Sequence, residues 1–188
     1  MSDAIVDACC FINVYASRDL RGFLTASSWT WHIPQPALAE SLYIRVTNDD
    51  GEEDRKRIDP QACLDEGLIT LVNVEDAEAA LYVQLAGELD DGEAMALAIA
   101  KLRGWILATD DRKAQRFANH QGVEVITTPE LIQDWAKSAS MTPTKIKALL
   151  GNIESGARYA PAENAPGYGW WMSFTGETDP TGGAGTIT

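Results

Sequence analysis

The residues best suited to catalysis in this chain are carboxylates, and the densest group of them lies within residues 89–115. In that stretch a short apolar run, Trp105 to Ala108, is typical of a parallel strand that is covered on both faces. Asp110 and Asp111 follow the run almost immediately. Because ligands bind at the carboxyl ends of the strands in open α/β sheets, these two acids occupy a position suited to function.

The segment before this strand predicts a buried helix that begins at another group of acids. Asp90 and Glu93 have the spacing of a capping box, the residues after them form a broad apolar face, and Gly104 ends the helix. Capping alone accounts for Glu93, and an N-cap role at the next helix accounts for Asp110 or Asp111. Taken singly, each of these acids therefore has a structural explanation as well as a chemical one.

The first strand of the chain ends at an acid in the same way. Residues 4–6 form a brief apolar run, Asp7 follows it, and residues 8–16 predict a helix that turns back. Asp7 lies among apolar residues and cysteines, so we expect it to be partly buried. A buried carboxylate without a partner is costly, which makes a purely incidental role for Asp7 hard to accept.

Glu40 belongs to a helix that Pro34 and Pro36 are expected to start and that residues 37–46 are expected to continue. Its neighbours leave open whether it faces solvent or a polar pocket. Residues 47–60 mix six acids with three basic residues and lack an apolar period, which favours a solvated loop or a frayed helix end.

The alternation of strands with helices predicts an α/β protein, a three-layer sandwich around a mainly parallel central sheet. The face formed by Ile146, Leu149, Leu150 and Ile153 follows helical spacing and must be buried on the domain or on a partner. The expected strands are residues 4–6, 69–74, 105–108 and 123–126, and the expected helices are residues 8–16, 75–88 and 90–103 and those beginning near residues 111, 128 and 142.

Length and composition predict one domain and an extension. With 188 residues, 45% of them apolar, the chain can bury a full core, which we place in residues 1–158. Residues 159–188 are rich in Gly, Pro and Thr, and we expect a tail that is either disordered or docked through Trp170 and Trp171.

The cysteines and the N-terminus favour an intracellular protein. Cys9, Cys10 and Cys63 form an odd set without metal-type spacing, which favours reduced thiols and gives no sign of a zinc site. The first ten residues lack a basic region and a long apolar run, so no signal peptide or membrane-spanning helix is expected. The sequence thus predicts a cytoplasmic protein with no membrane partner.

The overall charge opposes binding to nucleic acid. Against 28 acids there are 15 Lys and Arg, a net charge of −13, so a polyanionic substrate would need local attraction. Arg112 and Lys113 directly follow Asp111, and Lys101, Arg103 and Arg116 are their neighbours in the sequence. We regard Arg112 and Lys113 as candidates for binding phosphates; the competing interpretation is a solvated helix face with ordinary ion pairs.

Considered together, the acids favour a metal site. Gathering several carboxylates at one sheet edge raises their pKa values unless a cation compensates for the repulsion. Oxygen ligands without His or Cys favour a hard ion, Mg²⁺ or Mn²⁺. Such an ion would hold a phosphate, lower the pKa of a bound water and stabilise the leaving oxygen, which is the chemistry of phosphodiester hydrolysis.

The order and setting of these motifs resemble the PIN domain ribonucleases, especially the single-domain toxins of prokaryotic toxin–antitoxin pairs. The resemblance covers roughly residues 4–160, the length of a single domain. Each motif alone has little specificity for the family, whereas the ordered set is fairly specific. The stretches that carry it are AIVDACCFINVYA, IPQPALAESL, LDDGEAMALAIA, ATDDRKAQRFA and TPTKIKALLGNIESGARYAP.

The resemblance implies an endoribonuclease with one or two Mg²⁺ or Mn²⁺ ions. In that family pattern the catalytic and metal-binding acids correspond to Asp7, Glu40, Glu93 and Asp111. Asp110 and Asp91 would lie behind these ligands or replace one of them, and Asn13 and Thr109 would orient ligands or water. The family also implies RNA as the substrate, a protein antitoxin whose basic segment covers the acids, and a homodimer.

Two other functions remain open. A PIN-like module without nuclease activity would serve as a binding or scaffold protein, which the negative charge and the long tail favour. A phosphotransfer domain of the receiver or phosphatase kind also gathers acids at strand ends. The phosphotransfer interpretation ranks third because Asp7 is followed by Ala8 and Cys9, without a second Asp two residues on, and because residues 123–127 end without a Lys.

Overall fold

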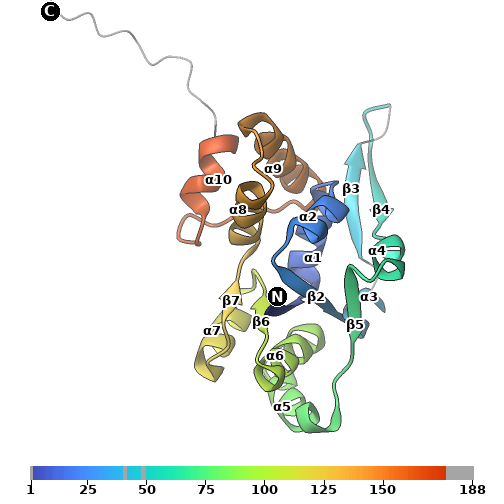
Figure 1. Ribbon diagram of the computed structural model, residues 1–188, viewed down its shortest axis with the longest axis vertical. Helices are drawn as coiled ribbons and strands as arrows, with labels where there is room; N and C mark the ends of the chain where they lie inside the picture. The colour runs from blue at the N-terminus through green and yellow to red at the C-terminus, as the bar shows by residue number, and fades with distance from the viewer. Residues whose placement is uncertain (1, 40–41, 48–49, 177–188) are drawn as a thin grey trace, which may run out of the picture.

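A computed structural model describes residues 2–39, 42–47 and 50–176. Its centre is a five-stranded sheet in the order β5-β2-β1-β6-β7, in which every pair of neighbouring strands is parallel (Figure 1). The strands of this sheet are β1 (Ser2–Val6), β2 (Trp29–Pro34), β5 (Ile69–Val72), β6 (Ile106–Ala108) and β7 (Val125–Ile126).

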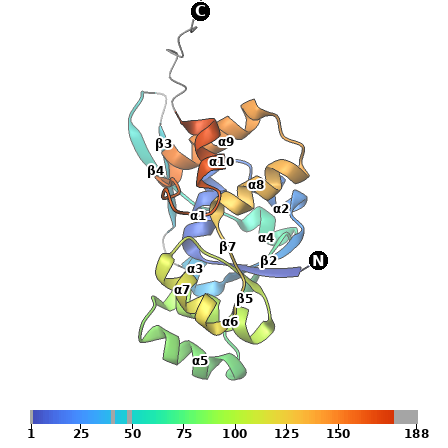
Figure 2. The same ribbon diagram turned by 90° about the vertical axis from the view of Figure 1, so that its left-hand side faces the viewer.

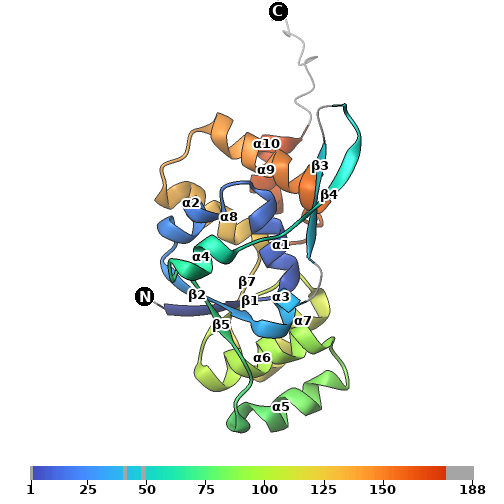
Figure 3. The same cartoon turned by 90° about the vertical axis from the view of Figure 1, so that its right-hand side faces the viewer.

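Helices cover both faces of the sheet (Figure 3). Ala4 and Val6 of β1 point into one apolar core while Ile5 between them points into the other, as alternation along a strand requires. The predicted three-layer α/β sandwich is therefore confirmed. One face carries α1 (Ala8–Ala16), α2 (Leu20–Ala26), α8 (Thr128–Ser138), α9 (Pro143–Ala157) and α10 (Tyr168–Thr175), and the other carries α5 (Asp76–Ala86), α6 (Asp91–Arg103) and α7 (Arg112–Gln121).

The region after β2 differs from the sequence-based expectation. The helix expected over residues 37–46 is wrong: α3 spans Gln35–Ala39, and β3 (Tyr43–Thr47) pairs antiparallel with β4 (Glu53–Arg57). Aromatic and β-branched residues favour the extended form in β3. Every residue of β4 is exposed, so this strand has no apolar alternation to reveal it. The short α4 (Gln61–Asp65) follows the hairpin.

A second correction concerns the start of α6. Asp90 is the N-cap residue, as expected, but its side chain makes no capping hydrogen bond, so only the half of the predicted capping box in which Glu93 accepts from the Asp90 backbone is present. Gly104 does end the helix in the left-handed conformation, with φ of 69°. Glu93 therefore caps the helix through the Asp90 backbone, without a reciprocal bond from the Asp90 side chain.

The C-terminal helices pack on the domain. Ile146, Leu149, Leu150 and Ile153 of α9 are all buried, and α9 contacts α1, β3 and α10. In α10, Trp171 is 0% exposed and its indole nitrogen donates to Glu154 at 2.8 Å. Within the described residues, no helix is both long and apolar enough to cross a membrane.

Trp171 and Trp170 allow a matched test of how α10 is held. Trp171→Ala should lower the free energy of unfolding by about 3–5 kcal/mol, because it empties a fully buried site. Trp170 is only partly buried, against Phe174, so Trp170→Ala should cost less. Urea denaturation of the full chain measures both; equal losses would contradict this packing.

An ion pair joins α5 to α6 on the other face of the sheet. The Arg103 guanidinium donates to Glu78 at 2.6 Å, and the Glu78 side chain is only 4% exposed. The same guanidinium lies 5.0 Å from the ring centre of Trp105, which stacks on His32. Hydrogen bonding to Arg103 lowers the pKa of Glu78 below its ordinary value.

A lowered pKa makes the contribution of Glu78 dependent on pH. This contribution is complete above the pKa of the unfolded chain and is lost as the pH falls through the lower pKa of the folded protein. Glu78→Gln should therefore be destabilising near pH 7, by about 1–3 kcal/mol, and approach wild type as the pH falls below the ordinary pKa of a Glu, about 4.3. Glu75→Gln is the control: Glu75 also contacts Arg103 but its side chain is 76% exposed, so a comparable loss there would contradict the assignment.

Candidate active site

The order of the strands reverses between β1 and β6. From β1 the chain builds β2 and β5 on one side, then returns to build β6 and β7 on the other (Figure 1). Val6 pairs with Ala108, so Asp7 and Thr109 follow side by side, and the amide of Asp7 donates to the carbonyl of Ala108 at 3.1 Å. The crevice at such a reversal is where open α/β sheets bind ligands.

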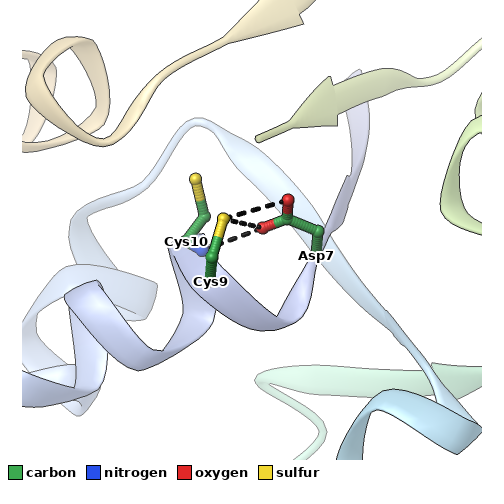
Figure 4. Close-up of side chains that lie close together, drawn as sticks. All are labelled: Asp7, Cys9 and Cys10. Carbon is green, nitrogen blue, oxygen red and sulfur yellow. Dashed lines mark hydrogen bonds between the residues drawn. The ribbon is translucent and has the colours of Figure 1, made fainter. Parts of the chain in front are cut away.

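Asp7 is a buried carboxylate at the start of α1. Its Oδ1 accepts a hydrogen bond from the Cys10 amide at 2.8 Å, and the Cys9 thiol lies 3.1 Å from both carboxylate oxygens (Figure 4). Asp7 is 4% exposed, and burial raises its pKa to about 6, against the opposing hydrogen bonds from Thr109, Cys10 and Cys9. Within the described residues no Lys or Arg pairs with it.

Asp110, by contrast, accepts hydrogen bonds from five donors. Its Oδ1 accepts from the Thr128 amide and the Tyr159 hydroxyl, both at 2.9 Å. Its Oδ2 accepts from the Asn13 amide at 2.9 Å, the Cys10 thiol at 3.3 Å and the Thr128 hydroxyl. A carboxylate has about four lone-pair positions, so this one is fully engaged. Asp110 thereby ties α1, α8 and the segment after α9 to the end of β6.

Burial keeps two of these donors protonated. It raises the pKa of the Tyr159 hydroxyl, with the negative charge of Asp110 adding to the effect. It also raises the pKa of the Cys10 thiol well above the ordinary value. Both groups therefore remain neutral hydrogen-bond donors to Asp110 near neutral pH.

Asp111 and Glu93 lie around the same space as Asp7. Asp111 is the N-cap of α7, and its Oδ1 accepts from the amides of Lys113 and Ala114 at 2.7 and 2.8 Å. Glu93, in the first turn of α6, is half-buried, and burial followed by the charge of Asp111 raises its pKa, with a smaller contribution from Asp7. Glu93 thus interacts electrostatically with the two acids that begin α1 and α7.

The other predicted site residues have varied positions. Asn13 and Thr109 are buried, and each hydrogen-bonds to an acid of the site. Asp91 is exposed at the start of α6. Glu40 lies outside the described residues.

The two predicted phosphate-binding residues already have partners within the protein. The Arg112 guanidinium donates to the Asn164 side chain at 2.5 Å. The Lys113 ammonium donates to the backbone carbonyl of Glu88 and lies 3.8 Å from the Glu88 carboxylate. Arg112 therefore has no acidic partner among the described residues, whereas Lys113 has one.

The donors at this site suit a divalent cation. Asp7 is desolvated without a cationic partner, and Glu93 and Asp111 add negative charge nearby, so an ion would relieve the repulsion. In the described part of the chain, the one trio of potential ligands within 4.8 Å of one another is Asp7, Cys9 and Cys10, which adds sulfur to the oxygen donors. No trio of carboxylates is that close there.

Sequence reasoning found Asn13 among the donors that hold Asp110, through the family resemblance, but missed the others. Thr128 was visible only as a helix start, Cys10 as a reduced thiol and Tyr159 as the first residue of a tail. Their separation from Asp110 along the chain is 18, 100 and 49 residues, so no local pattern joins them. The isolated Tyr159 after an amphipathic helix was the one available signal.

The fold and the site define an α/β protein in which a buried acid, Asp7, and several half-buried acids lie at the reversal of a parallel sheet. The family model for the PIN domain matches residues 3–164. The chain belongs to the PIN domain family, whose members are generally nucleases, and the resemblance noted in the sequence is confirmed.

Among solved structures, a PilT N-terminus domain protein from the hyperthermophilic archaeon Sulfolobus solfataricus has 17% sequence identity and a TM-score of 0.46, over 74% of this chain and 96% of that one. No curated protein matches the chain. The family assignment therefore rests on the family model.

Asp110 and Asp111 permit a test of the hydrogen-bond network. Asp110→Asn replaces an acceptor oxygen by a donor group that faces other donors, and should lower the free energy of unfolding by about 1–3 kcal/mol. Asp111→Asn retains an acceptor at the N-cap and should change stability by less than about 0.5 kcal/mol. Chemical denaturation without divalent ions distinguishes them, and a larger loss for Asp111→Asn would refute the role given to Asp110.

Proposed function

We propose that this protein is a metal-dependent endoribonuclease that hydrolyses RNA phosphodiester bonds. The observation that carries the proposal is the buried Asp7, which has no cationic partner among the described residues and lies beside the end of β6. The proposal is also supported by membership of the PIN domain family, whose members are generally nucleases. Structural capping explains Asp111 fully, but it leaves the cost of burying Asp7 unexplained.

In this proposal Asp7, Glu93 and Asp111 hold Mg²⁺ or Mn²⁺, together with Glu40, whose position is not described. When bound, the ion would supply the Lewis acidity that phosphodiester hydrolysis needs. Asp110 is the positioning residue: its oxygens are already engaged, so it keeps α1 and α8 in place around Asp7. Asp91 remains an alternate ligand at the start of α6.

The polar residues beside the acids orient them. Thr109 hydrogen-bonds to Asp7 through its side chain and accepts the amide of Asp111 at 3.1 Å, so one hydroxyl links two acids. Asn13 donates to Asp110 and to the Thr128 hydroxyl. These groups fix the carboxylates before any substrate arrives, which reduces the cost of organising the site.

We extend the proposal to a toxin of a toxin–antitoxin pair. The resemblance to the single-domain toxins supports it, as does the net charge of −13, which suits a basic partner segment. An antitoxin of this kind would place an Arg among the carboxylates and block the site. A homodimer is expected on the same resemblance.

A second candidate function is a PIN-like scaffold without nuclease activity. Two observations favour it: Asp110 is fully engaged with protein donors, and no three carboxylates of the described residues lie within 4.8 Å of one another. Under this alternative the acids would cap helices and bind a basic partner. The two functions differ in their response to metal.

Asp7→Asn separates these candidates. Because Asn caps a helix about as well as Asp, the variant should fold and keep the bond to the Cys10 amide. Millimolar Mn²⁺ or Mg²⁺ should raise the melting temperature of wild type and permit cleavage of a pool of structured RNAs, and both effects should vanish in Asp7→Asn.

Asp134→Asn is the matched control, since Asp134 is an exposed acid of α8 outside the site. It should respond to metal and cleave RNA as wild type does. The nuclease proposal is wrong if wild type shows neither metal stabilisation nor cleavage, or if Asp7→Asn cleaves as fast as wild type.

A further inference from the structure

A cleft of about 600 Å³ borders the acidic site. It lies between α7, the start of α8 and residues 159–166, which lead from α9 towards α10; Figure 2 shows this segment above α7 (yellow). Asp110 and Tyr159 form the part of its wall that faces the network described above. The cleft is thus joined to the acids through Asp110.

The wall provided by α7 is polar and cationic. Arg112 and Arg116 are one helical turn apart, so both guanidinium groups line the same side of the cleft. Neither pairs with an acid among the described residues, and Arg116 has no hydrogen bond there either. The side-chain amides of Gln115 and Asn119 lie on the same wall.

The opposite wall is formed mainly by small apolar residues, with Asn164, whose side chain accepts a hydrogen bond from Arg112 at 2.5 Å, as its polar member. It contains no charged side chain, and most of its residues are exposed or half-exposed, so a flat group could pack against them. The apolar residues of this wall are Ala160, Pro161, Ala162, Ala165 and Pro166.

We propose that this cleft binds one nucleotide of the RNA, adjacent to the phosphodiester that the acids cleave. The inference rests on the proposed function and deepens it by assigning a substrate-binding site. Arg112 and Arg116 hold the phosphate, since guanidinium groups match phosphate oxygens in geometry and charge. The base and sugar lie against the apolar wall, and Gln115 and Asn119 supply polar contacts.

Size and charge favour a nucleotide over a simple anion. A volume of about 600 Å³ is within the range of small-molecule sites and far exceeds the size of a phosphate group. Two arginines without an acidic partner among the described residues, in a chain of net charge −13, also supply the local attraction that an RNA substrate needs. The half-apolar lining suits a base better than a second charged group.

The test measures RNA binding separately from cleavage. A fluorescein-labelled RNA hexamer of alternating adenosine and uridine is titrated with the full wild-type chain in the presence of a chelator, and fluorescence anisotropy gives Kd. Arg112→Gln/Arg116→Gln should weaken binding at least about tenfold at low salt. The slope of log K against log salt should become shallower by about 1.4, for two lost contacts to single-stranded RNA.

Two further variants make the result specific. Arg55→Gln/Arg57→Gln removes the same charge from the exposed strand β4 and should leave binding within about twofold of wild type. Ala162→Trp fills the cleft without changing charge and should weaken binding by about tenfold. Each variant is first compared with wild type by thermal unfolding, so that loss of folding is not taken for loss of binding.

The outcomes separate this inference from the proposed function. If wild type cleaves RNA but the cleft variants bind the hexamer as wild type does, the cleft assignment is wrong and the nuclease stands. Equal weakening by the β4 variant and the cleft variant would reduce the effect to overall charge and overturn the assignment. If wild type neither binds nor cleaves RNA with metal, both fail.

Discussion

The hydrogen bonds on Asp110 are the interaction on which the site depends most. Without them, α1, α8 and the segment after α9 would have no common attachment at the end of β6. A carboxylate can be held there because five donors meet it, four of them on three buried residues. The bond from Tyr159 to Asp110 also positions part of the wall of the neighbouring cleft, because Tyr159 lines it.

Asp7 and Asp110 have contrasting environments. The two acids follow neighbouring strands, yet one is saturated with donors and the other is buried with a pKa raised to about 6. This difference suits a site in which one acid holds the surrounding elements in place and the other is available to bind a cation. The register of β1 on β6, Val6 beside Ala108, is what brings the two together.

Much of the fold follows from apolar periodicity and strand–helix alternation, which gave the parallel sheet and the amphipathic α9. The β3–β4 hairpin could not be predicted this way, because β4 is exposed throughout and is held by backbone hydrogen bonds to β3. Asp7 and the Asp110–Asp111 pair were visible at strand ends. The partners of Asp110 other than Asn13 were not, since contacts such as that to Cys10 join residues far apart in the chain.

The most direct test of the metal site is to grow crystals with Mn²⁺ and to measure their anomalous scattering. We expect an anomalous peak within coordination distance of the Asp7 carboxylate, with Glu93 or Asp111 as a further ligand and with Asp110 still hydrogen-bonded to Thr128. A map without a peak at Asp7, or with the ion bound only at surface acids, would contradict the claim that the reversal of the sheet holds a metal site.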